Sequence, residues 1–233
     1  MQHVIVITGA VGALGSSLSR LLVARGYRVA GVGLRRHEER LRTLEQELGA
    51  AFAGFLLEDD STAAWGTALG AVESRLGSVF GAALIAGGWR GGRPFHEERD
   101  EDTWRSMLDE NLESGQRALL PRLVAQRAGS VVVVGSRNVE RPWSGAGAAP
   151  YTVAKSAVVA LARVVAAEVL DAGVRVNAVL PSTIDTAQNR AAMPAADTTG
   201  WVKPESIAAV IEFLLSEAAR DVSGAVLPVY GRA

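Results

Sequence analysis

The sequence predicts an α/β fold of the Rossmann type: a doubly wound sheet of about seven mainly parallel strands with helices on both faces, in a three-layer sandwich. Short runs of valine, isoleucine and leucine alternate with longer stretches of helical period along the whole chain. Strands that are apolar throughout are typical of a parallel sheet covered on both faces. The alternation contains no linker and no break in composition, so we expect one domain spanning residues 1–233.

Each element is indicated by a local pattern. Ser61 has the character of a helix N-cap, Gly49 follows a helix end, and Pro204 lies near a helix start. Strands are expected at residues 4–8, 27–33, 52–57, 79–86, 130–135, 174–180 and 225–229. Helices are expected at residues 14–25, 38–48, from the Ser61 cap to about residue 76, 102–127 in two pieces, 151–171 and 204–217.

Two connections exceed the usual length of about 4–6 residues. They span residues 87–100 and residues 181–203, and the second is expected to be irregular. Both leave the carboxyl ends of strands, where doubly wound sheets bind ligands. We therefore expect the substrate site at these two loops.

The composition is that of a globular enzyme, because 48% of the 233 residues are hydrophobic and 21% are charged. The formal net charge of -1 provides no basic excess for a nucleic acid or a membrane surface. The chain has no cysteine, and His3, His37 and His96 lack ligand spacing, so no metal site is expected. We recognise no signal peptide and no apolar run of about 18 residues, and expect a cytoplasmic protein without a membrane segment.

A glycine-rich turn between the first strand and the first helix predicts a dinucleotide site. Gly9, Gly12 and Gly15 let the backbone turn sharply and approach a pyrophosphate, which the free N–H groups of a helix N-terminus bind. Leu14, in the same turn, is also expected to contact the cofactor. Such turns occur as plain structure too, but the position in a first βαβ unit favours nucleotide binding.

The end of the second strand indicates which dinucleotide is bound. Enzymes that use NAD place an acidic residue there for the ribose 2′-hydroxyl, whereas this chain has Arg35 and Arg36. Two guanidinium groups suit the 2′-phosphate of NADP(H). The alternative is a solvated basic helix start; we predict NADP(H).

Tyr151 and Lys155 form a candidate catalytic pair. A spacing of four residues puts both side chains on one helical face, about one turn apart. A neighbouring ammonium favours the phenolate and lowers the pKa of a tyrosine from about 10 toward the working range. The structural alternative is a packed tyrosine beside a lysine whose stem covers apolar surface. Ser136, at the carboxyl end of the preceding valine strand, favours the catalytic interpretation because it adds a third polar group at that sheet edge.

With these motifs in order, the sequence resembles the short-chain dehydrogenase/reductase family over essentially its whole length. The matching elements are the turn of residues 8–15, Ala86 with Gly87, Asn111, Ser136, Tyr151 with Lys155, and Pro181 to Thr186. The resemblance implies that Tyr151 is the general acid in reduction and that Lys155 binds the nicotinamide ribose. It implies that Ser136 holds the substrate oxygen and that Asn111 supports a water-mediated proton relay.

The resemblance also implies cofactor contacts beyond the glycine turn. They are expected from Glu58, Ala86, Gly87, Pro181, Ile184 and Thr186. Glu58 stands where the family often has an aspartate that meets the adenine. Ser136 lies fifteen residues before Tyr151, two more than is usual in the family.

Several loop sequences resemble one branch of the family, the quinonoid dihydropteridine reductases. The shared features include Gly12-Ala13-Leu14-Gly15 and the glycine-rich segment around Trp89. Those enzymes generally lack the serine and the asparagine, and they prefer NADH through an acidic residue after the second strand. A pterin substrate is therefore an open alternative.

The sequence thus predicts an NADPH-dependent oxidoreductase that reduces a small carbonyl or imine-like substrate, with Trp89, Ser136 and Asn189 as substrate contacts. One alternative is a dihydropteridine reductase, and another is a sensor or scaffold that binds NADP without chemistry. The intact set of polar site residues argues against the sensor, which has no need of a proton donor. The resemblance implies a homodimer or homotetramer.

Overall fold

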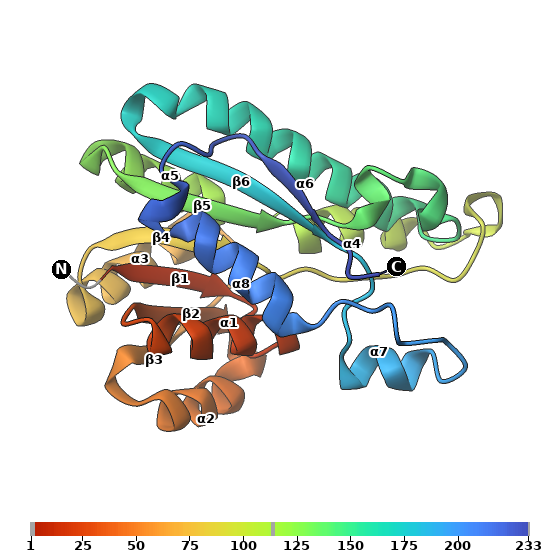
Figure 1. Cartoon of the computed structure of the whole chain (residues 1–233), viewed down its shortest axis with the longest axis horizontal. Helices are drawn as coiled ribbons and strands as arrows, with labels where there is room; N and C mark the ends of the chain where they lie inside the picture. The colour runs from red at the N-terminus through yellow and green to blue at the C-terminus, as the bar shows by residue number, and fades with distance from the viewer. Residues whose placement is uncertain (1–2, 113–114, 233) are drawn as a thin grey trace.

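The computed structural model describes residues 3–112 and 115–232, apart from the side chains of residues 101 and 116. Its strands form one sheet in the order β3-β2-β1-β4-β5-β6-β7, with every neighbouring pair parallel (Figure 1). The strands are β1 (Val4–Thr8), β2 (Arg28–Leu34), β3 (Phe52–Leu57), β4 (Val79–Leu84), β5 (Gly129–Val134), β6 (Val174–Pro181) and β7 (Val226–Val229). The predicted doubly wound α/β fold is confirmed.

Helices cover both faces of the sheet because successive strand residues point to opposite sides. In β1, Val4 and Val6 belong to one core cluster, and Ile5 and Ile7 belong to the other. The first cluster is closed by α3 (Thr62–Leu76), α5 (Gly115–Gln126) and α6 (Ala149–Glu168), and α4 (Glu101–Asn111) packs on α6. The second cluster is closed by α1 (Ala13–Ala24), α2 (Glu38–Leu48) and α8 (Pro204–Leu215).

Ser61 and Gly49, the residues predicted to begin and end helices, do so in the structure. The Ser61 hydroxyl accepts a hydrogen bond from the Ala64 N–H at 3.2 Å and caps α3. Gly49 follows α2 with a φ of 66°, a conformation that a glycine adopts without strain. The bounds of most elements differ from the prediction by one to three residues, which is where helix and strand ends fray.

The expectation that residues 181–203 are irregular is wrong in part. The short helix α7 (Ala187–Ala192) lies within them, and the Thr186 hydroxyl caps it by accepting from the Asn189 N–H at 3.0 Å. Ile184 and Val202 then pair as a parallel bridge that joins the two ends of the segment. A helix of six residues is too short to show an apolar period, which is why the sequence pattern does not reveal it.

Helix α6 is long and apolar enough to cross a membrane by length and composition alone. Its inner face, however, packs on the sheet through Val158, Ala162 and Val165, and the core helix of a folded domain passes the same test. The start of this helix carries Tyr151 and Lys155 at the carboxyl edge of the sheet.

Candidate active site

The glycine turn after β1 is a tight backbone structure. The Gly12 N–H donates to the Gly9 carbonyl at 2.9 Å, and a Cβ on Gly15 would lie 2.1 Å from the same carbonyl oxygen. Gly9 has a φ of 64°, in the left-handed region that favours glycine. The Thr8 hydroxyl accepts from the N–H groups of Ile85 and Ala86, both at 3.0 Å, and joins the turn to the segment after β4.

The turn forms one wall of a cleft of about 1040 Å³ along the carboxyl edge of the sheet. The other walls come from the ends of β2 and β4, the last turn of α4 and the segment before and within α7. Ten of the predicted site residues line it: Gly9, Gly12, Leu14, Gly15, Arg36, Ala86, Gly87, Ile184, Thr186 and Asn189. The other predicted residues lie outside this lining: Arg35, Glu58, Trp89, Asn111, Ser136, Tyr151, Lys155 and Pro181.

One corner of the cleft is positively charged. Arg36, His37 and Arg40 line it, and the Arg40 guanidinium donates to the Val11 carbonyl in the glycine turn. Burial and then the charges of Arg36 and Arg40 lower the pKa of His37 below its ordinary value. This corner therefore favours an anion over a further cation.

Arg35, predicted to bind the 2′-phosphate of the nucleotide, pairs with Glu58 instead. Its guanidinium forms two hydrogen bonds with the Glu58 carboxylate, at 2.6 and 3.2 Å, and both side chains are largely exposed. The sequence interpretation missed Arg40, although it lies one helical turn after Arg36. It also missed Asp60, which lines the cleft and accepts from the Trp65 indole N–H at 2.7 Å.

Tyr151 and Ser136 meet at the carboxyl end of β5. Tyr151 is half-buried, and the Ser136 side chain lies close enough to its hydroxyl to favour the phenolate. Ser136 also accepts from the Asn138 N–H at 3.3 Å, which holds its oxygen at the end of the strand. The two hydroxyls, predicted from different elements, are thus brought together by the sheet edge.

Lys155 lies one turn further along α6 and is 6% exposed. Its ammonium donates to the Val134 carbonyl at 2.9 Å and lies 6.0 Å from the centroid of the Tyr151 ring. Burial raises the pKa of Tyr151 above its ordinary value, and the Ser136 side chain only partly opposes this. The expectation of a lowered tyrosine pKa is therefore wrong for this structure, because desolvation of the phenol outweighs the favourable contacts.

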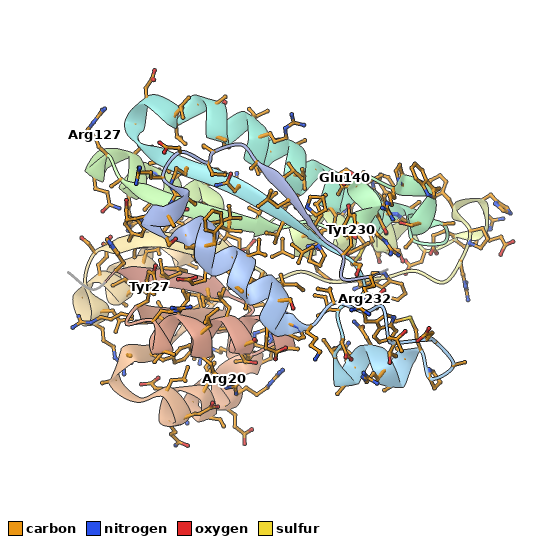
Figure 2. All side chains as sticks on the ribbon, viewed as in Figure 1. Arg20, Tyr27, Arg127, Glu140, Tyr230 and Arg232 are labelled. Carbon is orange, nitrogen blue, oxygen red and sulfur yellow. The ribbon has the colours of Figure 1, made fainter. Side chains whose placement is uncertain are left out.

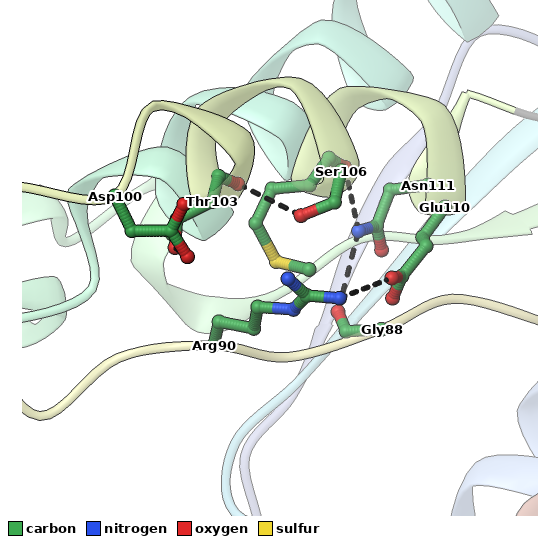
Figure 3. Close-up of polar contacts among 8 residues, drawn as sticks. Gly88, Arg90, Asp100, Thr103, Ser106, Glu110 and Asn111 are labelled. Atoms are coloured by element: carbon green, nitrogen blue, oxygen red, sulfur yellow. Dashed lines mark hydrogen bonds and ion pairs between the residues drawn. The ribbon is translucent and has the colours of Figure 1, made fainter.

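Asn111, in the last turn of α4, has a buried acceptor without a partner. Its Nδ2 donates to the Met107 carbonyl at 2.8 Å and to the Gly88 carbonyl at 3.2 Å (Figure 3). Its Oδ1 is buried and accepts no hydrogen bond from the part of the chain that the structure describes. Such an atom costs free energy unless a ligand or water satisfies it.

Asn111 and Lys155 both place a polar side-chain atom next to Gly87. A Cβ at Gly87 would lie 2.5 Å from Asn111 Oδ1 and 3.1 Å from Lys155 Nζ, so only a glycine leaves the space open. Gly87 lines the cleft, and the polar groups behind it therefore adjoin the cleft floor.

The residues present fit a nicotinamide dinucleotide. The glycine turn suits a pyrophosphate, the basic corner suits an anionic ribose substituent, and the unpaired Asn111 oxygen with Lys155 provides polar groups at the other end. In residues 3–112 and 115–232, no three His, Asp or Glu side chains gather where they would hold a metal ion.

The predicted substrate contacts lie around the mouth of this site. Trp89 is 63% exposed, and the Gly92 N–H donates to the Gly147 carbonyl at 2.8 Å, which ties the loop of residues 87–100 to the start of α6. The Asn189 amide donates to the Ile184 carbonyl at 2.8 Å and so is engaged within its own segment.

The segment after β7 contacts the loop that follows Ser136. The Tyr230 hydroxyl donates to the Glu140 carboxylate at 2.8 Å (Figure 2). Burial and then this contact raise the pKa of Tyr230 to about 12. Arg141 lies over the Tyr230 ring, 5.1 Å from its centroid. The segment after β7 thus supports the loop that follows Ser136.

Gly15→Ala is expected to weaken nucleotide binding by at least about tenfold and to lower the melting temperature. The added methyl group meets backbone atoms of Gly9 and Ala10, which cannot move without opening the turn. Titration of the purified variant with ADP measures the first effect, and thermal unfolding measures the second. Gly70→Ala in α3 is the matched control: its Cβ has nothing within 4 Å, so it should keep binding and stabilise the helix by about 0.5–1 kcal/mol. Equal binding by the two variants would contradict the assignment of the turn.

Known proteins resemble this chain over its whole length. The sequence model of the family described as short chain dehydrogenase matches residues 3–197. Galactitol 2-dehydrogenase (L-tagatose-forming) of Cereibacter sphaeroides is 32% identical over 243 residues, which cover 97% of this chain and 92% of that protein. 3-Oxoacyl-(acyl-carrier-protein) reductase of Salmonella typhimurium is 28% identical over 239 residues, covering 97% and 94%.

Solved structures agree. A short-chain type dehydrogenase/reductase from Mycobacterium ulcerans superposes with a TM-score of 0.89 at 28% identity and covers 100% of this chain and 90% of that one. A 3-ketoacyl-(acyl-carrier-protein) reductase from Brucella melitensis, complexed with NADH, shares the fold with a TM-score of 0.84 at 23% identity, covering 99% and 98%. None of these relatives is named as a dihydropteridine reductase, so the resemblance to the quinonoid dihydropteridine reductase branch stays a prediction. The chain belongs to the short-chain dehydrogenase/reductase family, whose members are oxidoreductases that bind NAD(P).

Proposed function

We propose that this protein is an NADPH-dependent reductase of a small carbonyl or imine-like substrate, with Tyr151 as the proton donor. The proposal rests on the position of the Tyr151 and Ser136 hydroxyls beside Lys155. The Lys155 ammonium and the unpaired Asn111 oxygen both lie next to Gly87, which lines the cleft. A reduction needs a proton donor next to the dinucleotide, and this arrangement supplies one.

The reaction divides between the nucleotide and the protein. When bound, the reduced nicotinamide supplies a hydride to the substrate carbon. Ser136 donates a hydrogen bond to the substrate oxygen, and Tyr151 transfers its proton to the same oxygen. Lys155 would hold the ribose hydroxyls of the bound nucleotide, and Asn111 would hold a water through which Tyr151 is reprotonated.

The choice of NADPH rests on the basic corner. Arg36 and Arg40 line the cleft, and their positive charges, after burial, lower the pKa of His37. A 2′-phosphate would satisfy both guanidinium groups with charge-assisted hydrogen bonds. Arg35 is the weaker candidate because Glu58 already pairs with it.

A raised tyrosine pKa favours the reductive direction. With its pKa above the ordinary value of about 10, Tyr151 is protonated throughout the neutral range, as a proton donor must be. We expect kcat/KM for reduction to be constant between about pH 6 and 8 and to fall only as the pH approaches the tyrosine pKa. The oxidative direction needs the phenolate, so its rate should rise with pH over the same range. Rates measured in both directions check this, and a reduction rate that falls between pH 6 and 8 would contradict it.

The proposal is tested by following the oxidation of NADPH and NADH with a panel of ketones, aldehydes, imines and quinonoid dihydropterin. Turnover of a carbonyl or imine with NADPH supports it, and preferred turnover of the pterin supports the dihydropteridine alternative. Tight NADPH binding without turnover of any panel member would overturn the reductase assignment in favour of a sensor.

Association of copies is part of the same proposal. Val153, Leu161 and Val164 expose 40–56% of their surface along the outer side of α6, which supports a dimer or tetramer built on this helix. Light scattering of the purified protein measures the oligomeric state.

A further inference from the structure

The segment after β4 is fastened to the last turn of α4 at two adjacent positions. The Gly88 carbonyl accepts from Asn111 Nδ2 at 3.2 Å, and Arg90 Nη2 forms an ion pair with Glu110 Oε1 at 2.9 Å. Figure 3 shows the Arg90 side chain running beneath α4 with its guanidinium at the Glu110 carboxylate. Neighbouring helix residues thus hold residues 88 and 90 of one loop.

Gly88 and Glu110 are fitted to each other. A Cβ on Gly88 would lie 1.7 Å from Glu110 Oε2 and 3.2 Å from the Met107 methyl group. The carboxylate therefore occupies the space that a side chain at position 88 would take. It rests against the loop backbone while its other oxygen binds Arg90.

The position of the Gly88 carbonyl matters for Asn111. Both contacts of Asn111 Nδ2 are used, one to Met107 within the helix and one to Gly88 in the loop. These two contacts leave Oδ1 pointing at Gly87, near Lys155 Nζ. If the loop moved, the amide would lose the contact that sets its rotation, because the bond to Met107 lies within its own helix.

We infer that Arg90 and Glu110 are positioning residues, which hold the Gly88 carbonyl where it orients the Asn111 amide toward the cleft floor. The inference rests on the proposed function in one respect, the role of Asn111 in reprotonating Tyr151. Glu110 lines the cleft, but the ion pair contacts none of the proposed reacting groups, and the proposed route of its effect is the Asn111 amide.

A merely structural role predicts different behaviour. Arg90 and Glu110 are 45% and 42% exposed, and ion pairs this exposed contribute little to folding stability. Arg20 and Glu47 form a similarly exposed pair (50% and 44%) between α1 and α2, across the sheet from α4 (Figure 1). Loss of either pair should therefore change the melting temperature by a similar small amount, and only loss of the first should change turnover.

The kinetic test compares Arg90→Ala, Glu110→Ala and the double variant with Glu47→Ala as the control. Each single variant should lower kcat by about tenfold, with the KM for NADPH within about twofold. A misplacement of about 1 Å in a site can cost about a hundredfold, and a smaller one costs less. The double variant should be no slower than the singles, because the pair acts as a unit. Glu110→Gln, which keeps an oxygen acceptor for Arg90, should retain at least about a third of kcat. Unchanged kcat in the singles, or losses that multiply in the double variant, would overturn the inference.

Gly88→Ala probes the same contact from the loop side. Its methyl group displaces the flexible end of Glu110 while both charges remain, so the fold should persist and kcat should fall to the level of Glu110→Ala. If kcat instead stays at the wild-type level with the carboxylate displaced, the ion pair has no positioning role.

A measurement on the cofactor-free protein separates this inference from the proposed function. The side-chain NH₂ resonances of Asn111, identified by their absence in Asn111→Asp, should shift and exchange faster with solvent in Glu110→Ala but not in Glu47→Ala. Unchanged resonances would overturn the inference whether or not the wild type has turnover. If the resonances shift but the wild type reduces no substrate, the proposed function has failed and the positioning of Asn111 stands.

Discussion

Tyr151→Phe is expected to lower kcat for reduction by about 10²–10⁴-fold, the range that positioned proton transfer contributes. The variant keeps the ring that fills the half-buried site and removes only the hydroxyl, whose pKa the Ser136 side chain influences. Its fold and its Kd for NADPH should therefore be nearly unchanged. Single-turnover kinetics with a substrate from the panel and calorimetric titration with NADPH measure the two properties separately.

Tyr27→Phe is the matched control for this loss. Tyr27 is also a partly buried tyrosine whose pKa is raised by burial, but it precedes β2 at the amino ends of the strands, away from the cleft (Figure 2). It should retain wild-type turnover. Full turnover by Tyr151→Phe with a proven substrate would end the assignment of Tyr151 as the proton donor.

The second large effect is expected at the basic corner. In Arg36→Gln and Arg40→Gln, binding of 2′,5′-ADP should weaken by roughly tenfold to a hundredfold, since hydrogen bonds to charged groups contribute about 1.5–3 kcal/mol each. Binding of 5′-ADP, which lacks the 2′-phosphate, should change far less. Isothermal titration of the free protein with both nucleotides gives the selectivity directly, without a substrate.

Two comparisons make the result specific. Arg35→Gln should leave the ratio of the two affinities nearly unchanged, because Glu58 already engages that guanidinium at the surface. Arg40 also donates to the Val11 carbonyl, so the 5′-ADP titration reports any loosening of the glycine turn. A loss of 2′,5′-ADP affinity in Arg35→Gln alone would assign the phosphate to Arg35 instead, and no loss in any of the three would remove the basis for NADPH.

Some site residues follow from local sequence because their geometry is local. Glycines at 9, 12 and 15 in a strand-to-helix turn, and a tyrosine and a lysine four residues apart in α6, have relative positions that one element determines. Arg40 was accessible to the same reasoning, because it follows Arg36 by one helical turn. The short helix α7 was not, since six residues are too few for a period.

Other site features depend on which segments meet. Arg35 and Arg36 are equivalent in the sequence, yet Glu58 from the end of β3 pairs with the first, and the second lines the cleft. Asp60 rather than Glu58 lines the cleft, for a similar reason. The direction of the Tyr151 pKa shift also requires the packed site, because burial rather than sequence proximity to Lys155 dominates it.

Local patterns are enough to predict the doubly wound fold, the glycine turn and the Tyr151–Lys155 pair, because hydrophobic period, backbone freedom and helical spacing act over a few residues. Tertiary packing sets which arginines face the cleft, where the unpaired Asn111 oxygen points and how Arg90 and Glu110 hold the Gly88 loop. Those features join residues that are about 20 positions or more apart in the chain, and only packing determines which of many possible polar partners comes within hydrogen-bond reach.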